Sequence, residues 1–177
     1  MSQPENKNNI KPTLENKDLY KVALDTRNFE ISLFWQRSNY FLALNSALAL
    51  GFFNLKEQGL YGLMMAIFGI IVSYLWFRVN LGSKFWQSRW EERLRIIERQ
   101  IDENLKFFSA DWDTIKQDVE QSLLNNPRRG LFKMWLQRGV LKKPSVSNQM
   151  ILLSGCFFIG WMILALLWCW RFASSHG

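Results

Sequence analysis

The chain has 177 residues, of which 49% are hydrophobic, and a formal net charge of +7 at pH 7. These bulk values fit an ordinary globular domain, but the apolar residues are concentrated in three blocks at about 39–55, 60–77 and 150–171. Each block has about the 17 to 25 residues that a helix needs to cross the hydrocarbon layer of a membrane. No charged side chain interrupts a block before Arg171, at the end of the last one. The distribution predicts an all-α integral membrane protein with three transmembrane helices.

The basic residues are also unevenly placed, since 20 of the 22 Lys and Arg lie before residue 39 or within 78–143. By the positive-inside rule these segments face the cytoplasm, which places the N-terminus in the cytosol and the tail at 172–177 outside. The positive charge flanks membrane helices and comes without a nucleic-acid recognition motif. We therefore expect anionic lipid headgroups, and not nucleic acid, as partners.

The first 17 residues are polar, rich in Asn and interrupted by Pro4 and Pro12. This composition predicts a disordered cytosolic tail and not a secretory signal. In the next segment, 18–38, apolar residues recur at steps of three and four, which predicts an amphipathic helix at the cytosolic membrane surface. No Pro or Gly separates this segment from the first membrane helix at 39–55, so we expect one continuous helix over 18–55.

Small residues mark the faces on which the first two membrane helices are expected to pack. The polar turn at 54–59 is short, so the helices 39–55 and 60–77 form an antiparallel hairpin. Small side chains at four-residue steps let two backbones approach closely in lipid, either inside this hairpin or between subunits. They are Ala43, Ala47 and Gly51 in the first helix and Gly62, Ala66, Gly69 and Ser73 in the second.

Asn45 is the one strongly polar side chain deep in the first membrane helix. Polar groups within a membrane usually face a helix bundle or a water-filled cavity. One interpretation is a hydrogen bond from Asn45 to the neighbouring helix. The other is that several copies of Asn45 line a pore around an axis, which would be weakly selective because no ring of charges accompanies them.

The second membrane helix is predicted to continue past Arg78 into a cytosolic helical hairpin over 78–126. Its first arm has an apolar stripe at helical spacing that begins with Trp86 and Trp90, and we expect these two residues to pack between helices or subunits. A second helix, capped by Ser109 or Asp111, is expected to turn its own apolar stripe toward the first.

The segment 127–146 alternates basic and aromatic residues, as do segments that lie in the headgroup plane. We interpret it as an interfacial segment, for which ordinary anchoring and a regulatory lipid site are the two alternatives. The third transmembrane helix, 149–171, follows it. The candidate headgroup-binding residues are Arg128, Arg129, Lys133, Trp135, Lys142 and Lys143.

Residues of the common catalytic and metal-binding types lack the spacing that such chemistry needs. The single histidine, His176, is next to last in the chain, and no phosphate-binding loop, dinucleotide turn or nucleophile elbow is present. The carboxylate pairs Asp111 and Asp113, and Glu91 and Glu92, are more simply capping and surface charges. We therefore expect no enzyme activity, no cofactor and no metal.

Three runs carry a resemblance to a known family: "NFEISLFWQRSNYFLALNSALALGFF" at 28–53, "SYLWFRVNLGSKFWQSRWEERL" at 73–94 and "FSADW" at 108–112. In their order they are similar to the RipA family of octameric bacterial inner-membrane proteins. The resemblance implies a homo-octamer in the bacterial cytoplasmic membrane, linked to growth or survival inside host cells or under stress, without an established enzymatic activity.

Two hypotheses for function follow. The first is a non-enzymatic, self-assembling membrane protein that acts as a scaffold for the envelope or as an adaptor for a cytosolic or membrane protein partner. The alternative is an oligomeric ion channel or pore-forming effector. Ion flux into proteoliposomes distinguishes them, because a scaffold leaves the bilayer tight.

Overall fold

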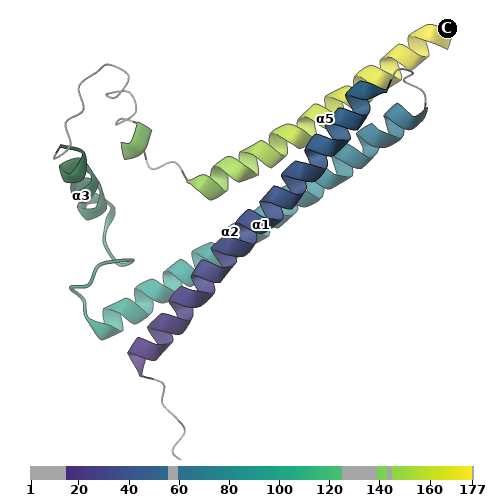
Figure 1. Ribbon diagram of the computed structural model, residues 1–177. Coiled ribbons are helices and arrows are strands. Elements are labelled where there is room, and N and C mark those ends of the chain that lie inside the picture. Colours follow the sequence, from purple (N-terminus) through teal and green to yellow (C-terminus); the bar gives the residue numbers. More distant parts are fainter. Residues whose placement is uncertain (1–14, 56–59, 125–138, 143–144, 177) are drawn as a thin grey trace, which may run out of the picture.

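The computed structural model describes residues 15–55, 60–124, 139–142 and 145–176. In these residues the chain forms the helices α1 (Asn16–Asn54), α2 (Leu60–Ile101), α3 (Trp112–Leu124) and α5 (Val146–His176), with one helical turn at 139–141 and no strand. The predicted all-α class is confirmed. Figure 1 shows α1, α2 and α5 as long rods that run together, while α3 lies apart from them.

The long helices extend across the boundaries between charged and apolar sequence. α1 covers the amphipathic segment 18–38 and the apolar block as far as Asn54 in one helix, because no Pro or Gly lies between Asn16 and Gly51. It begins at Asn16, two residues before the expected start, where the Glu15 carbonyl accepts the amides of the first turn. α2 runs unbroken for 42 residues. α5 continues beyond the expected end at 171 to His176, so the expected tail is helical there.

The three long helices pack as antiparallel neighbours, α1 along α2 and α2 along α5. Apart from Val72, the buried residues of α2 recur at steps of four and three, with one step of seven between Gln87 and Leu94. A repeat that averages 3.5 residues keeps one face of a helix against its neighbours and is typical of left-handed supercoiled packing. These residues are Gly62, Ala66, Gly69, Ser73, Trp76, Asn80, Ser83, Gln87, Leu94 and Glu98.

Glycine is required where α5 crosses α2. A Cβ atom at Gly69 would lie only 2.3 Å from the Trp161 ring, and one at Gly62 would lie 3.1 Å from the Trp168 indole nitrogen. Trp161 is buried and packs with Phe52 and Ala66 in a small core that joins all three long helices. The absence of a side chain at Gly69 therefore makes room for the largest residue of this core.

Two helices of the described chain, α2 and α5, are long and apolar enough to cross a membrane. Only 33% of the most apolar window of α2 and 11% of that of α5 is buried, whereas the core helix of a soluble protein is mostly buried. α1 is not among them, because Asn39, Asn45 and Asn54 lower the hydropathy of its apolar block. Of the three predicted transmembrane helices, composition and length thus support two.

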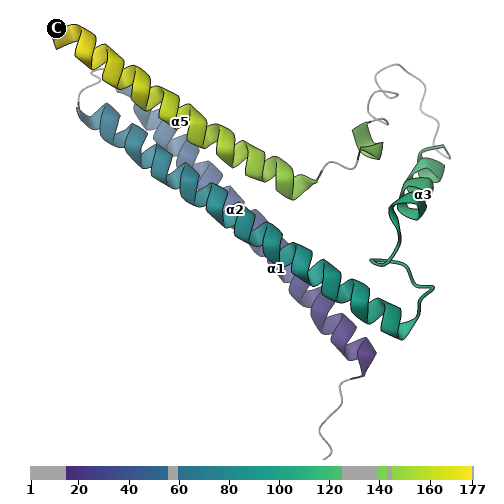
Figure 2. The ribbon, with the colours of Figure 1, turned by 180° about the vertical axis from the view of Figure 1, so that it is seen from behind.

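The predicted pairing of two helices in the segment 78–126 is not realised. α2 reaches only Ile101, and α3 does not pack along it, as Figures 1 and 2 show from opposite sides. The chain between them turns at Asp102, whose carboxylate accepts the backbone amide of Asn104, and passes Lys106 with φ of 47°. The apolar stripe of α3 is therefore not matched to that of α2. Residues 125 and 126 lie outside the described residues.

Candidate functional site

Polar side chains, and not the expected apolar stripe, line much of the contact between the three long helices. The first cluster surrounds Asn45, which has no exposed surface. Its side-chain oxygen accepts the Ser73 hydroxyl at 2.7 Å and the Trp161 indole N–H at 3.0 Å, and its nitrogen donates to the Phe41 carbonyl at 2.9 Å. One residue of α1 is thus bonded to both neighbouring helices, since Ser73 lies on α2 and Trp161 on α5.

A second cluster lies two turns further along α2, around Asn80. Its amide nitrogen donates to the Met150 carbonyl at 3.1 Å and to the Ser154 hydroxyl at 3.2 Å, both on α5. The Ser38 hydroxyl of α1 lies 3.5 Å from the Asn80 oxygen, which is long for a hydrogen bond. Two turns beyond, Ser147 donates to the Gln87 side-chain oxygen at 2.7 Å. These pairs fix α5 on α2 in one register, because a shift of either helix would leave buried polar groups unpaired.

A crevice of about 620 Å³ opens where the charged ends of α1 and α2 meet the first turn of α5. The Arg27 guanidinium forms an ion pair with Glu91 at 3.3 Å and lies over the Phe108 ring, 5.5 Å from its centre. Lys84 and Arg95 also line the crevice. Both partners of the Arg27 ion pair are partly exposed, so the pair stabilises the fold by at most about 1 kcal/mol. The crevice is a cationic surface with aromatic walls.

Glu98 stabilises the turn after α2 through hydrogen bonds. This fully buried carboxylate accepts the backbone amides of Phe107 and Phe108, the latter at 2.8 Å, and the Ser109 hydroxyl at 3.3 Å. These donors stabilise the buried carboxylate, which forms no ion pair with a cation of the described residues. Burial, and after it the Glu98 charge, raises the pKa of Tyr20 above 10.0. The Glu98 carboxylate is thus a structural anchor of the turn after α2.

The predicted small residues divide into two groups. Gly62, Ala66, Gly69 and Ser73 are all buried in the contacts of α2 with α1 and α5. Gly51 is half-buried, and a Cβ atom on it would lie 2.9 Å from the flexible Met65 side chain. Ala43 and Ala47, by contrast, are exposed on the opposite side of α1. The α2 group therefore packs within one chain, while the α1 pair faces away from it.

The predicted aromatic and lipid-facing residues lie largely away from the buried contacts. Trp86 is exposed beneath the Arg89 guanidinium, 5.5 Å from the ring centre, and Trp90 is half-buried. Lys142 is exposed. The other candidate headgroup residues, Arg128, Arg129, Lys133, Trp135 and Lys143, lie outside the described residues.

The carboxylates that were considered as acids or bases have structural partners. Glu91 pairs with Arg27, and Glu92 with Arg95 at 3.0 Å. A hydrogen bond from the Thr114 side chain lowers the pKa of Asp111, which precedes α3 and so caps it. No group of three or more His, Cys, Asp or Glu side chains suited to a metal ion occurs among the residues that the structure describes. Cys156 and Cys169 are free thiols on α5.

Long apolar helices with exposed apolar faces and an internal seam of polar contacts define a helical membrane protein. The comparison with family models is specific: the model of the octameric membrane protein family (8xMP) matches residues 17–170. The chain belongs to this family, and the resemblance to an octameric membrane-protein family inferred from its sequence is confirmed. Neither the curated proteins nor the solved structures contain a significant match to the chain.

Proposed function

We propose that the protein is a non-enzymatic homo-oligomer of the bacterial inner membrane, octamer-like in size, that acts as an envelope scaffold or adaptor in stress or intracellular survival. The observation that carries this proposal is that polar side chains of the long helices point into the bundle, while apolar side chains point outward. Most buried polar side chains of the bundle bond to one another within the chain, with the Ser83 hydroxyl and the Trp76 indole N–H as exceptions among the described residues, while the exposed faces of the apolar helices are hydrophobic. Such faces suit lipid and further subunits.

The proposal includes a third membrane crossing by residues 39–54 of α1. The polar side chains that lower the hydropathy of this segment are largely satisfied inside the protein: Ser46 donates to the Leu42 carbonyl and Asn54 to the Leu50 carbonyl, both at 2.8 Å. Asn45 makes the three hydrogen bonds described above. Polar groups paired in this way cost little in lipid. With this crossing the N-terminus lies in the cytosol and the C-terminus outside, as the distribution of Lys and Arg favours.

The adaptor role rests on the charged end of the bundle. There the crevice presents Arg27, Lys84 and Arg95 beside aromatic rings, a surface suited to anionic lipid headgroups or to an acidic segment of a protein partner. The proposal involves no catalytic step, because the described carboxylates Glu91, Glu98 and Asp111 serve ion pairing, backbone anchoring and helix capping.

The alternative function, an ion channel or pore, requires Asn45 to face a lumen. Within one chain its carboxamide is turned toward Ser73 and Trp161. The test is ion flux into proteoliposomes that contain the octamer. A tight bilayer supports the scaffold. A leak in the wild-type protein that is abolished by Asn45→Leu would overturn it in favour of the channel.

A further inference from the structure

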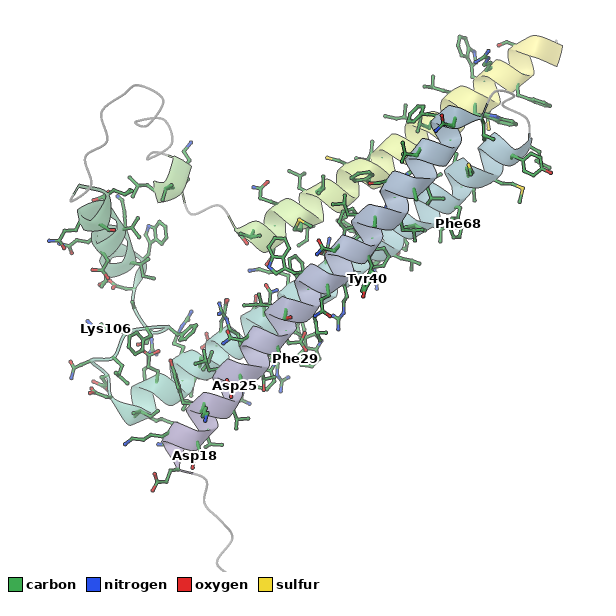
Figure 3. All side chains as sticks on the ribbon, viewed as in Figure 1. Asp18, Asp25, Phe29, Tyr40, Phe68 and Lys106 are labelled. Carbon is green, nitrogen blue, oxygen red and sulfur yellow. The ribbon has the colours of Figure 1, made fainter. Side chains whose placement is uncertain are left out.

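α1 has a second regular face, on the side away from α2. With the polar residues Thr26 and Gln36 at two intervening positions, its apolar members follow alternating steps of three and four, and several are strongly exposed: Val22 at 58%, Phe29 at 61% and Tyr40 at 76%. In Figure 3, Asp18, Asp25, Phe29 and Tyr40 follow one another along α1 toward its apolar end. No other helix lies in front of Phe29 and Tyr40 in this view. We call this face the outer seam of α1; it consists of Leu19, Val22, Phe29, Leu33, Tyr40, Ala43, Ala47 and Leu50.

α2 has a matching uncovered face, opposite its contacts with α1 and α5. With Gly82 and Glu92 at two intervening positions, it follows the same alternating steps of three and four, and its exposed apolar members include Phe68 at 50% and Phe85 at 65% exposure. We call this face the outer seam of α2; it consists of Phe68, Ile71, Leu75, Arg78, Phe85, Arg89 and Ile96.

We propose that the outer seam of α1 packs against the outer seam of α2 in the next copy of the chain, and that this contact, repeated, closes the ring. The inference rests on the proposed homo-oligomer and names its interface. A closed ring of more than two copies needs two different faces that fit each other. The two outer seams meet this requirement, because they lie on different helices and point away from the core of the subunit.

The register of the proposed contact follows from the contacts inside one chain. Asn45 bonds to Ser73, and Arg27 pairs with Glu91. Residue n of α1 therefore lies level with residue 118 − n of α2. Rotation about an axis along the membrane normal preserves these levels in the neighbouring copy. The same rule then places every apolar member of the α1 outer seam from Val22 to Leu50 level with a member of the α2 outer seam.

The side chains that face each other in this register are complementary in size. Ala47 is level with Ile71, and Ala43 with Leu75. Small residues opposite large ones allow close packing, which drives helix association in lipid. This arrangement uses the two small residues of α1 that are exposed in the single chain.

The charges that face each other in this register are also complementary. Asp25 is level with Arg93, and Asp18 is close to the level of Arg99. All four side chains are exposed, and none forms an ion pair within the described ranges of the chain. Phe29 is level with Arg89, in position for a cation–π contact. Opposite charges beside an apolar seam set which helices pair and in which direction.

The first test is disulfide cross-linking in membranes. In a background with Cys156→Ala and Cys169→Ala, the pair Phe29→Cys and Arg89→Cys is compared with the control pair Asn28→Cys and Arg89→Cys. Asn28 is an exposed neighbour of Phe29 that lies off the seam. Oxidation of the test pair is expected to give a ladder of covalent species up to the octamer, and the control pair is expected to remain monomeric on a denaturing gel.

Native mass spectrometry of each variant distinguishes a wrong interface from the absence of a homo-oligomer. A test variant that is octameric but is not cross-linked, together with the same result for Val22→Cys and Ile96→Cys, would overturn the proposed interface and leave the homo-oligomer intact. A wild-type protein that is not oligomeric would overturn the proposed function itself. If Phe29→Cys with Arg89→Cys prevents assembly, the cross-linking of Val22→Cys with Ile96→Cys tests the interface in its place.

A charge exchange provides an independent test. Asp25→Arg and Arg93→Asp should each lower the fraction of octamer in mild detergent, because each places like charges opposite one another. The double exchange should restore it. An octamer fraction in the double variant no higher than in the single variants would contradict the proposed register.

Discussion

Asn45 joins the three long helices, so its replacement by the similarly shaped Leu is the most informative change in the bundle. The variant Asn45→Leu leaves the Ser73 hydroxyl and the Trp161 indole N–H without their shared acceptor. A buried donor without a partner costs about 1–3 kcal/mol in soluble cores, whereas hydrogen bonds between membrane helices average about 0.6 kcal/mol. Two orphaned donors in this environment should therefore cost about 1–3 kcal/mol.

The loss is measured as the change in thermal unfolding midpoint in mild detergent, at a fixed protein concentration because assembly contributes to stability. The control is Asn45→Leu combined with Ser73→Ala, which removes one of the two orphaned donors. The double variant should recover part of the loss. The reasoning is refuted if Asn45→Leu is as stable as the wild type, or if the second change adds to the damage.

The remaining predictions concern helix packing and the region after α2. Gly69→Ala should destabilise the protein by about 1–3 kcal/mol through overpacking, since its Cβ atom would meet Trp161. Gly82→Ala is the control: a Cβ atom there would lie within 4 Å of no atom outside its own stretch of helix, so this change should be neutral or slightly stabilising. Equal thermal unfolding midpoints for the two variants would contradict this prediction. Glu98→Gln should speed hydrogen exchange at the amides of 107 and 108, because a charged acceptor is lost; unchanged protection would speak against the anchor. The lowered pKa of Asp111 means that its capping of α3 operates above about pH 4, the usual range of an Asp, and is lost as pH falls through the lowered pKa. Amide hydrogen exchange in α3, corrected for intrinsic rates, should therefore rise as the pH falls through the lowered pKa of Asp111. In the variant Asp111→Ala, the same exchange should already be faster than in the wild type at neutral pH.

The long helices were predictable because their signals are local. The apolar blocks locate α1 and α2, and the absence of Pro and Gly between Asn16 and Gly51 lets α1 run as one helix. The short polar segment 54–59 between two apolar blocks predicts the antiparallel pairing of α1 and α2, and the small residues Gly62 and Gly69 mark a true packing face.

The polar seam was not predicted, because hydrophobic periodicity selects the apolar face of a helix as the buried one. In α2 beyond Arg78 the structure buries Ser83, Gln87 and Glu98, and it leaves Trp86 exposed. In a helix that meets lipid and other subunits, an apolar face need not turn toward its own chain. The signal that was present is the spacing, since the steps of four and three that begin at Gly62 lead directly to these residues.

The position of α3 depends on contacts that no local pattern encodes. Its apolar stripe has helical spacing, and it forms a helix close to the expected place. The turn before it is set by Glu98, which binds backbone amides nine and ten residues further along the chain. A sequence pattern shows that a carboxylate is present, but not that it is buried beneath a turn.

The central claim is that the chain assembles through its outward faces into a defined ring, and the most direct measurement is the mass of the intact assembly. Native mass spectrometry of the full chain released from mild detergent should give one dominant species near 168 kDa, eight chains of 21.0 kDa each. Monomers or dimers alone, under conditions that preserve the native fold, would contradict the account.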